Sequence, residues 1–237
     1  MHPQNNVEIR AGLEGYAARP AAKAPHPGVV VLMEAYGLTG HIQGVCRRLA
    51  EAGYLALAPD FFHGQIIPYA DSQAAMAKIP TLQDAALVDE IAAGLDWLDA
   101  EGSQGKNGII GFCMGGRLAF LANCRLAARS RAAVAFYGGG IAPGSPQDKF
   151  GRIPPIGEAA KMQNPIFLGY GADDQGITPE EHARVTTALS AAKKRYTLAV
   201  YPNAAHAFLC EERANYAPAA APLAWRDTLD FLKANLG

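Results

Sequence analysis

Gly111-Phe112-Cys113-Met114-Gly115-Gly116 joins a short apolar run, residues 107–112, to a helix-forming run that begins at Arg117. We interpret this segment as a sharp strand-to-helix turn with Cys113 at its tip. Glycines two residues before and two residues after the cysteine are expected in such a turn, because side chains there would collide with the neighbouring strand and helix. The turn lifts the sulfur above the sheet and leaves it at a helix N-terminus, where the partial positive charge favours a thiolate.

The spacing matches the nucleophile elbow of α/β-hydrolases, G-x-S-x-G, with a thiol in place of the hydroxyl. The plain alternative is a glycine-rich turn that holds a buried, unreactive cysteine, since free cysteines are often simply small core residues. The remainder of the chain has to separate these two interpretations.

Length and composition exclude several classes of protein. The chain has 237 residues, half of them hydrophobic, and a net charge of −1, so neither nucleic acid nor a membrane surface is an expected partner. The N-terminus is polar, without the apolar core of a signal peptide, and no run reaches membrane-spanning length. The cysteines show no C-x-x-C and no zinc spacing; they are Cys46, Cys113, Cys124 and Cys210. We expect a cytoplasmic protein with free thiols and no metal or other cofactor.

Strand and helix patterns alternate along the whole chain, with no internal repeat and no linker. Expected strands cover residues 7–10, 12–18, 28–33, 54–58, 107–112, 132–137, 165–170 and 196–201. Expected helices cover residues 42–52, 70–78, 83–101, a segment that begins at 117, 179–192 and 218–236, and residues 141–161 are irregular. The alternation predicts one α/β domain over residues 1–237, a doubly wound, mostly parallel sheet with helices on both faces. In such sheets the active groups gather at the carboxyl ends of the strands.

A thiol nucleophile needs a base and a group that orients the base, and in α/β-hydrolases the acid precedes the histidine. Asp173 and Asp174 follow the strand that ends near residue 170, and His206 follows the strand that ends near residue 201. Either aspartate could be the acid. Taken singly, an aspartate there could be a turn or helix-cap residue, and His206 a loop histidine. Three groups in the required order, each after a strand, favour a catalytic triad.

The other histidines are weaker candidates. His63 could line a substrate pocket, whereas the remaining ones lie in the polar N-terminus, a turn, a helix start and an exposed helix; they are His2, His26, His41 and His182.

These blocks resemble those of the dienelactone hydrolase family, the carboxymethylenebutenolidases, over residues 7–236. Besides the cysteine turn, the resemblance rests on Gly171-Ala172-Asp173-Asp174, Ala204-Ala205-His206-Ala207-Phe208, residues 29–38, Ala58-Pro59-Asp60-Phe61-Phe62 and Glu212-Arg213-Ala214-Asn215-Tyr216. It implies a triad of Cys113, Asp174 and His206, because the family spacing from Gly171 to Ile177 favours Asp174 over Asp173. It also implies an oxyanion hole made by the backbone N–H groups of Ala35 and Met114.

The resemblance implies a further role for Glu34, since a glutamate at this place contacts the resting cysteine in the family. A carboxylate at the end of a buried strand is costly unless it is paired, and a neighbouring thiol can share a proton with it. The structural alternative is a salt bridge to Arg47 or Arg48.

The substrate is less clear, because the chain departs from the family at two positions. Dienelactone-specific members hold the substrate carboxylate with arginines, one of them four residues after the histidine; here that position is Cys210, and residues 61–83 contain Lys78 as their only cation. Lysine does not easily replace a bidentate arginine. A neutral or bulkier ester is therefore at least as good a candidate as dienelactone. Aromatic residues that could line the pocket are Tyr36, Phe62, Tyr137 and Phe208.

The sequence thus predicts a hydrolase of small esters or lactones that works through a thioester acyl-enzyme, most simply as a monomer. A thioesterase or another acyl hydrolase would use the same scaffold. A non-enzymatic alternative is a thiol redox sensor, with Cys210 as the resolving partner of Cys113.

Overall fold

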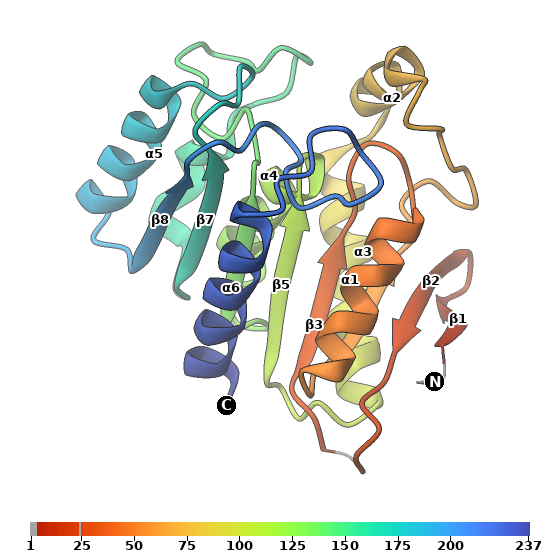
Figure 1. The fold of residues 1–237 in the computed structure, drawn as a ribbon. Coiled ribbons are helices and arrows are strands. Elements are labelled where there is room, and N and C mark those ends of the chain that lie inside the picture. Colours follow the sequence, from red (N-terminus) through yellow and green to blue (C-terminus); the bar gives the residue numbers. More distant parts are fainter. Residues whose placement is uncertain (1–3, 24) are drawn as a thin grey trace.

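The computed structural model describes residues 4–23 and 25–237, and in these residues an eight-stranded sheet forms the centre (Figure 1). Its strand order is β1-β2-β4-β3-β5-β6-β7-β8; β2 pairs antiparallel with β1 and β4, and the other neighbours are parallel. The strands are β1 Gln4–Arg10, β2 Leu13–Ala18, β3 Gly28–Leu32, β4 Leu55–Pro59, β5 Asn107–Phe112, β6 Ala132–Phe136, β7 Ile166–Gly171 and β8 Tyr196–Tyr201.

Helices cover both faces of this sheet. They are α1 Gly40–Glu51, α2 Ser72–Lys78, α3 Asp84–Ala100, α4 Met114–Arg125, α5 Pro179–Ala191 and α6 Ala220–Leu236, with 3-10 helices η1 Ile79–Thr81 and η2 Pro155–Lys161. Figure 1 shows α1 and α6 in front of the sheet and α3 and α4 behind it. Strands β3 to β7 are buried along their whole length, which explains why they are apolar on both faces.

The predicted fold class is confirmed: this is a single α/β-hydrolase domain with a mixed, mostly parallel sheet. The element boundaries agree with the predicted ones within two residues, except that β1 already begins at Gln4 and α4 already begins at Met114. The segment expected to be irregular, residues 141–161, contains η2 at its end. It follows β6 and therefore lies at the carboxyl edge of the sheet, where the functional groups also gather.

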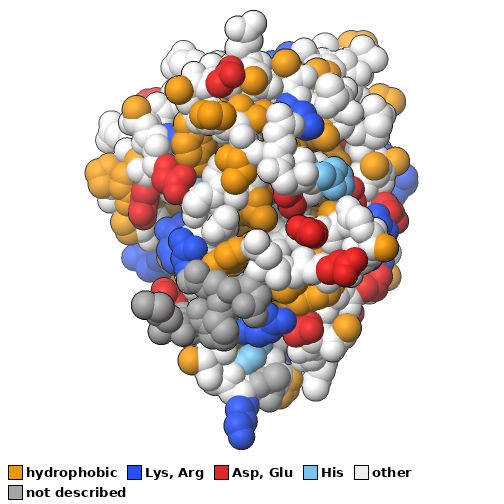
Figure 2. Space-filling view, turned by 90° about the vertical axis from the view of Figure 1, so that its right-hand side faces the viewer, with side chains coloured by type: hydrophobic (Ala, Val, Ile, Leu, Met, Phe, Trp, Pro, Cys, Tyr) orange, Lys and Arg blue, Asp and Glu red, His pale blue; other side chains and the backbone are white. Residues whose placement is uncertain are grey.

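Figure 2 shows the side of the molecule that carries β1 and β2, where acidic, basic and apolar side chains are interspersed. Among the described helices, none has both the length and the apolar character that crossing a bilayer requires.

Candidate active site

Cys113 occupies the strained turn between β5 and α4. Its backbone lies at φ 54° and ψ −115°, and its N–H donates a 3.0 Å hydrogen bond to the carbonyl of Phe136 in β6. A Cβ on Gly111 would overlap the backbone of Gly115, and a Cβ on Gly115 would overlap the carbonyl of Leu32; both approaches fall under 3.0 Å. The two glycines thus allow β5, α4 and β3 to meet closely enough to hold the strained turn.

The loops after β7 and β8 bring Asp174 and His206 together. Asp174 Oδ2 accepts a 2.7 Å hydrogen bond from His206 Nδ1, and its side chain is 1% exposed. The N–H of Gly176 donates to Asp174 Oδ1 at 2.8 Å, and Asn215 donates to the backbone carbonyl of His206 at 3.0 Å. Asp174 therefore orients the imidazole, Gly176 holds Asp174, and Asn215 holds the backbone of His206. Asp173, the other candidate, is exposed, and in the described part of the chain His206 bonds to Asp174 instead.

The electrostatics of this pair favour a charged imidazole. Burial lowers the pKa of His206, but Cys113 and the hydrogen-bonded Asp174 raise it by more, to about 10. Burial likewise acts to raise the pKa of Asp174, yet the bond from His206 leaves it below its usual value. This balance favours the charged form of the imidazole, which is bonded to a carboxylate and lies near the sulfur of Cys113.

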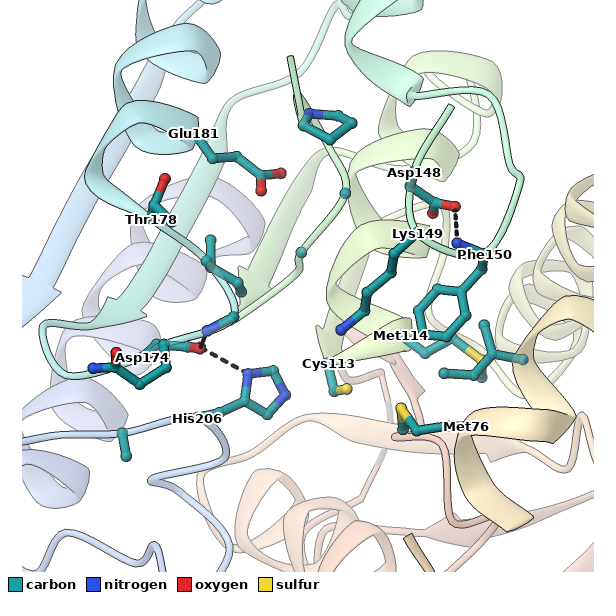
Figure 3. A pocket seen from close by; sticks show the side chains of 18 of the residues that line it. Met76, Cys113, Met114, Asp148, Lys149, Phe150, Asp174, Thr178, Glu181 and His206 are labelled. Atoms are coloured by element: carbon teal, nitrogen blue, oxygen red, sulfur yellow. Dashed lines mark hydrogen bonds and ion pairs between the residues drawn. The ribbon is translucent and has the colours of Figure 1, made fainter. Parts of the chain in front are cut away.

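Cys113 and His206 open into one cavity of about 530 Å³ (Figure 3). Its walls come from the loop after β6, from α2 and η1, and from the loop that leads into α5. Met76, Ile79 and Phe150 give it an apolar side. A cavity of this size suits a small organic substrate, with the thiol at one wall.

Three basic side chains line the same cavity, and the sequence analysis missed all of them. Arg152 is bonded to Asp148, and Arg184 donates to a backbone carbonyl. The ammonium group of Lys149 lies 5.2 Å from the ring of Phe150 and, in Figure 3, is directed toward Cys113. For Lys149 and Arg152 the signal in the sequence was position, since residues 141–154 follow the carboxyl end of a strand, whereas Arg184 lies in α5 and had no such signal.

The aromatic residues expected in the pocket lie elsewhere. Tyr36, Phe62, Tyr137 and Phe208 are each at most 4% exposed, and none of them lines the cavity. Tyr137 and Phe208 instead pack behind the imidazole, with ring centroids 5.2 Å apart between Tyr137 and His206 and 5.7 Å apart between the two aromatic rings. Burial of these large aromatic side chains in the hydrophobic core stabilises the fold more than their exposure in an open cavity would.

Other histidines also differ from expectation. His63 lies outside the cavity lining, with its Nε2 3.7 Å from Glu90. His182, expected on an exposed helix, is half-buried against the ring of Tyr170. His41, at the start of α1, is 6% exposed.

Glu34 follows β3 and is buried, with 1% of its surface exposed. Neither of its carboxylate oxygens has a hydrogen-bond partner among the described residues, and burial raises its pKa although Arg213 counteracts this. The nearest cation is Arg213, 3.9 Å from Oε1. The alternative pairing with Arg47 or Arg48 is wrong, because Arg47 bonds to Tyr16 and Arg48 approaches Glu211.

The two amides expected to form an oxyanion hole are placed by the same elements. Met114 begins α4, and Ala35 lies in the loop after β3. Within the described residues, neither N–H donates to a backbone carbonyl. Both donors thus stay available to a substrate oxygen.

Comparison with known proteins agrees with this geometry. The model of the dienelactone hydrolase family matches residues 13–236, so the chain belongs to that family, and it is a carboxylic ester hydrolase. An Escherichia coli (strain K12) protein named "Putative carboxymethylenebutenolidase" is 34% identical over 93% of this chain and 82% of its own length.

Solved structures show the same relationship. A "Putative Dienelactone Hydrolase" from Klebsiella pneumoniae has a TM-score of 0.85 at 31% identity, over 93% of this chain and 92% of that one. A dienelactone hydrolase-like promiscuous phosphotriesterase from metagenomic libraries has a TM-score of 0.80 at 26% identity, over 100% of this chain and 99% of the other.

Proposed function

We propose that this protein hydrolyses small carboxylic esters or lactones with Cys113 as nucleophile, His206 as proton donor and base, and Asp174 as the group that orients the histidine. The observation that carries the proposal is the 2.7 Å bond between His206 and Asp174, with the imidazole and the thiol of Cys113 on one cavity. A structural ion pair would have no need of a strained cysteine beside it.

The reaction begins when the sulfur of Cys113 attacks the carbonyl carbon of the ester as a thiolate. The negative charge that develops on the carbonyl oxygen is stabilised by the N–H groups of Ala35 and Met114, at a few kcal/mol for each donor. The tetrahedral intermediate then expels the alkoxide or enolate, which takes the proton from Nε2 of His206. The products of this half are a thioester on Cys113 and a neutral imidazole.

The second half returns the enzyme to its starting state. His206 Nε2 takes a proton from water, and the hydroxide attacks the thioester carbon. The acid leaves and Cys113 is released as a thiolate beside the imidazolium. Asp174 accepts the Nδ1–H bond throughout, so that Nε2 stays directed at the reacting atoms and the imidazolium is stabilised.

Glu34 serves the resting enzyme in this proposal. Its buried carboxylate has no hydrogen-bond partner among the described residues, and burial raises its pKa, so it can accept the proton of a thiol that turns toward it. His206 and Glu34 then offer two places to which the proton of Cys113 can go.

The cavity also bears on the kind of substrate. Basic side chains lie on the wall formed by residues 141–154 and α5, not at Cys210 or in residues 61–83, where dienelactone-specific relatives would carry arginines. Arg152 pairs with Asp148 and Arg184 bonds to a backbone carbonyl, whereas Lys149 has neither a hydrogen bond nor an ion pair among the described residues. We infer that neutral esters are accepted, and that an anionic group on the substrate is held by Lys149.

The decisive experiment uses aryl esters, lactones and acyl thioesters with the wild type and Cys113→Ala. We expect ester or lactone turnover that falls to background in the variant, whereas Cys124→Ala, a buried cysteine in α4, keeps it. Cys113→Ser should leave weak activity at best, because a hydroxyl ionises far less readily than a thiol. Wild-type-like turnover by Cys113→Ala would refute the proposal, and a preference for acyl thioesters would redirect it to a thioesterase.

A further inference from the structure

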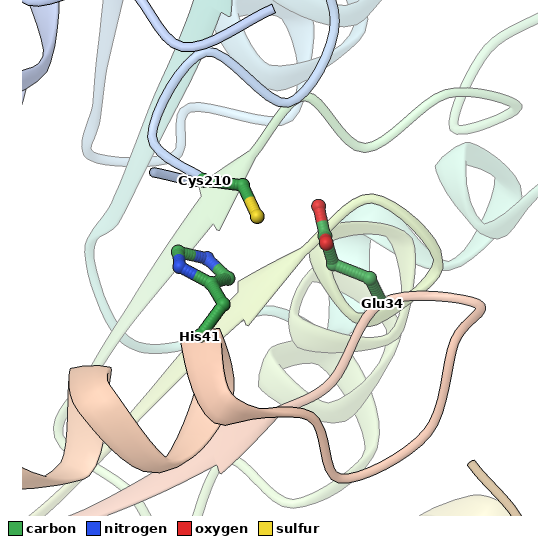
Figure 4. Close-up of side chains that lie close together, drawn as sticks. All are labelled: Glu34, His41 and Cys210. Atoms are coloured by element: carbon green, nitrogen blue, oxygen red, sulfur yellow. The ribbon is translucent and has the colours of Figure 1, made fainter. Parts of the chain in front are cut away.

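Three donor groups of different chemistry meet in the interior beneath the loop that follows β8. Glu34 comes from the end of β3, His41 from the start of α1, and Cys210 from the loop after β8 (Figure 4). One donor atom of each residue lies within 4.8 Å of the donor atoms of the other two, and all three residues are buried. Figure 4 shows their side chains facing a common space.

Most of these donor atoms lack partners. Both oxygens of Glu34 and the Nε2 of His41 are buried without a hydrogen bond in the described part of the chain. The sulfur of Cys210 has a 3.5 Å contact with the hydroxyl of Tyr69. Buried polar atoms are rarely left unpaired in native proteins, so several such atoms at one place indicate a missing ligand.

We propose that Glu34, His41 and Cys210 form a binding site for a borderline transition-metal cation, Zn²⁺ in the first place. Thiolate, imidazole and carboxylate are the zinc ligands of proteins, whereas Mg²⁺ and Ca²⁺ select oxygen donors. Three protein ligands leave the fourth position to water, as in open zinc sites.

The three donor atoms need to approach one another only slightly to bind a metal ion. At usual zinc–ligand lengths the ligand atoms of a tetrahedral site are roughly 3.3–3.7 Å apart. The longest separation here must therefore close by about 1 Å, which rotation of the Glu34 and Cys210 side chains can supply.

Protonation and charge agree with this assignment. Burial lowers the pKa of His41 to about 3, so its imidazole is neutral and keeps a lone pair for a metal. Burial raises the pKa of Cys210 to about 11, so its thiol proton must pass to the buffer when the metal binds. Arg213, near Glu34, does not repel the loaded site strongly, because two anionic ligands cancel the charge of the cation.

The test is direct titration of chelator-treated protein that carries Cys113→Ser, which removes the catalytic thiol. With Co²⁺ as probe we expect one equivalent to produce a thiolate-to-cobalt absorption band, and Zn²⁺ to bind in calorimetry with release of a proton. Adding Cys210→Ser should abolish the band, whereas adding Cys124→Ser should not. His41→Gln should weaken binding by more than about 100-fold, beyond the usual effect of losing an outer-sphere partner.

Absence of the band, or a band that survives Cys210→Ser, would overturn the site; if Cys210→Ser does not fold, the His41→Gln titration decides in its place.

One consequence rests on the proposed function. Because the metal occupies Glu34, Zn²⁺ should inhibit the wild type, and Cys210→Ser should keep its ester turnover and resist inhibition. Metal binding is measured in the Cys113→Ser protein and does not depend on ester turnover. A failure of metal binding can therefore be distinguished from a failure of the proposed hydrolysis.

Discussion

Replacing Asp174 with asparagine removes the charge beside His206 and little else. The asparagine carbonyl can still accept the bond from Gly176, which now goes to Oδ1 at 2.8 Å. The bond to His206 Nδ1 loses its charge, and the amide can present an N–H there, which would favour the wrong tautomer of the imidazole. The loop should therefore keep its fold while the base loses its orientation.

The expected loss of activity follows from the burial of Asp174 and from its distance to His206. Opposite unit charges about 4 Å apart interact by about 4 kcal/mol at an effective dielectric constant of about 20. The Asp174 side chain is 1% exposed, so little of this is lost to solvent. Four kcal/mol corresponds to about three decades in rate and up to about three units in the pKa of His206. We expect kcat/KM to fall by 10²- to 10³-fold, with roughly 10³ as the upper limit.

The assay is hydrolysis of an activated aryl ester over a range of pH, with circular dichroism as a check on folding. The wild type needs the imidazolium, so its activity should decline as pH rises toward the pKa of His206, about 10. In Asp174→Asn that decline should begin at lower pH, because one of the two groups that raise the pKa of His206, besides Cys113, is gone. Asp173→Asn, one residue earlier and exposed, is the matched control and should behave as the wild type. If Asp173→Asn were the damaged enzyme, the reasoning from the bond geometry would be refuted.

Three further predictions concern stability, specificity and pH. Arg117→Met should lower the free energy of unfolding, measured in urea, by about 3–5 kcal/mol. The reason is that Asp84 loses the two 2.8 Å hydrogen bonds that it accepts from a fully buried guanidinium. A loss of less than about 1 kcal/mol would contradict the prediction. Lys149→Ala should raise KM about 5-fold for esters that bear a carboxylate and leave neutral esters unchanged, with Lys161→Ala as control; equal effects on both esters would rule out charge recognition. The pKa of His206 is about 10 in the folded protein and 6.5 ordinarily, so the stability that its charged form contributes is complete below pH 6.5 and is lost toward pH 10. In thermal melts, the higher Tm of the wild type relative to His206→Gln should therefore shrink between pH 6.5 and pH 10. A difference that grows over this range would contradict the prediction.

The sequence predicted those parts of the molecule that depend on local rules. The alternation of buried strands and amphipathic helices defined the sheet, and the glycines around Cys113 indicated a turn whose steric reason the structure supplies. The order of nucleophile, acid and histidine along the chain brought Asp174 and His206 close because parallel strands end at one edge. Their catalytic roles remain predictions.

The walls of the cavity could not be predicted in this way. Residues 141–154 carry no periodic pattern, and their position depends on contacts distant in the sequence, such as the bond from Arg117 to the carbonyl of Ile153. Tyr36 and Phe208 were candidates for the pocket, but the sequence explained such aromatic residues equally well by core packing, and in the structure the core buries them. His41 was assigned to a helix start, and nothing local shows that α1 packs this residue into the interior.

Arg117 links the turn at Cys113 to the opposite wall of the cavity. It lies one helical turn after Cys113 in α4, is fully buried, and donates to Asp84 at the start of α3 as well as to the carbonyl of Ile153. The same helix that carries the thiol at its N-terminus thereby fixes the segment that presents Lys149 and Phe150 to the substrate. Arg117 also lies 3.6 Å from Asp148, but its hydrogen bonds and ion pairs in the described part of the chain include neither Lys149 nor Phe150, so these two side chains can change without disturbing the turn at Cys113. Substrate preference in this protein should therefore vary through residues 149 and 150, whereas a change at Arg117 should damage stability and chemistry together.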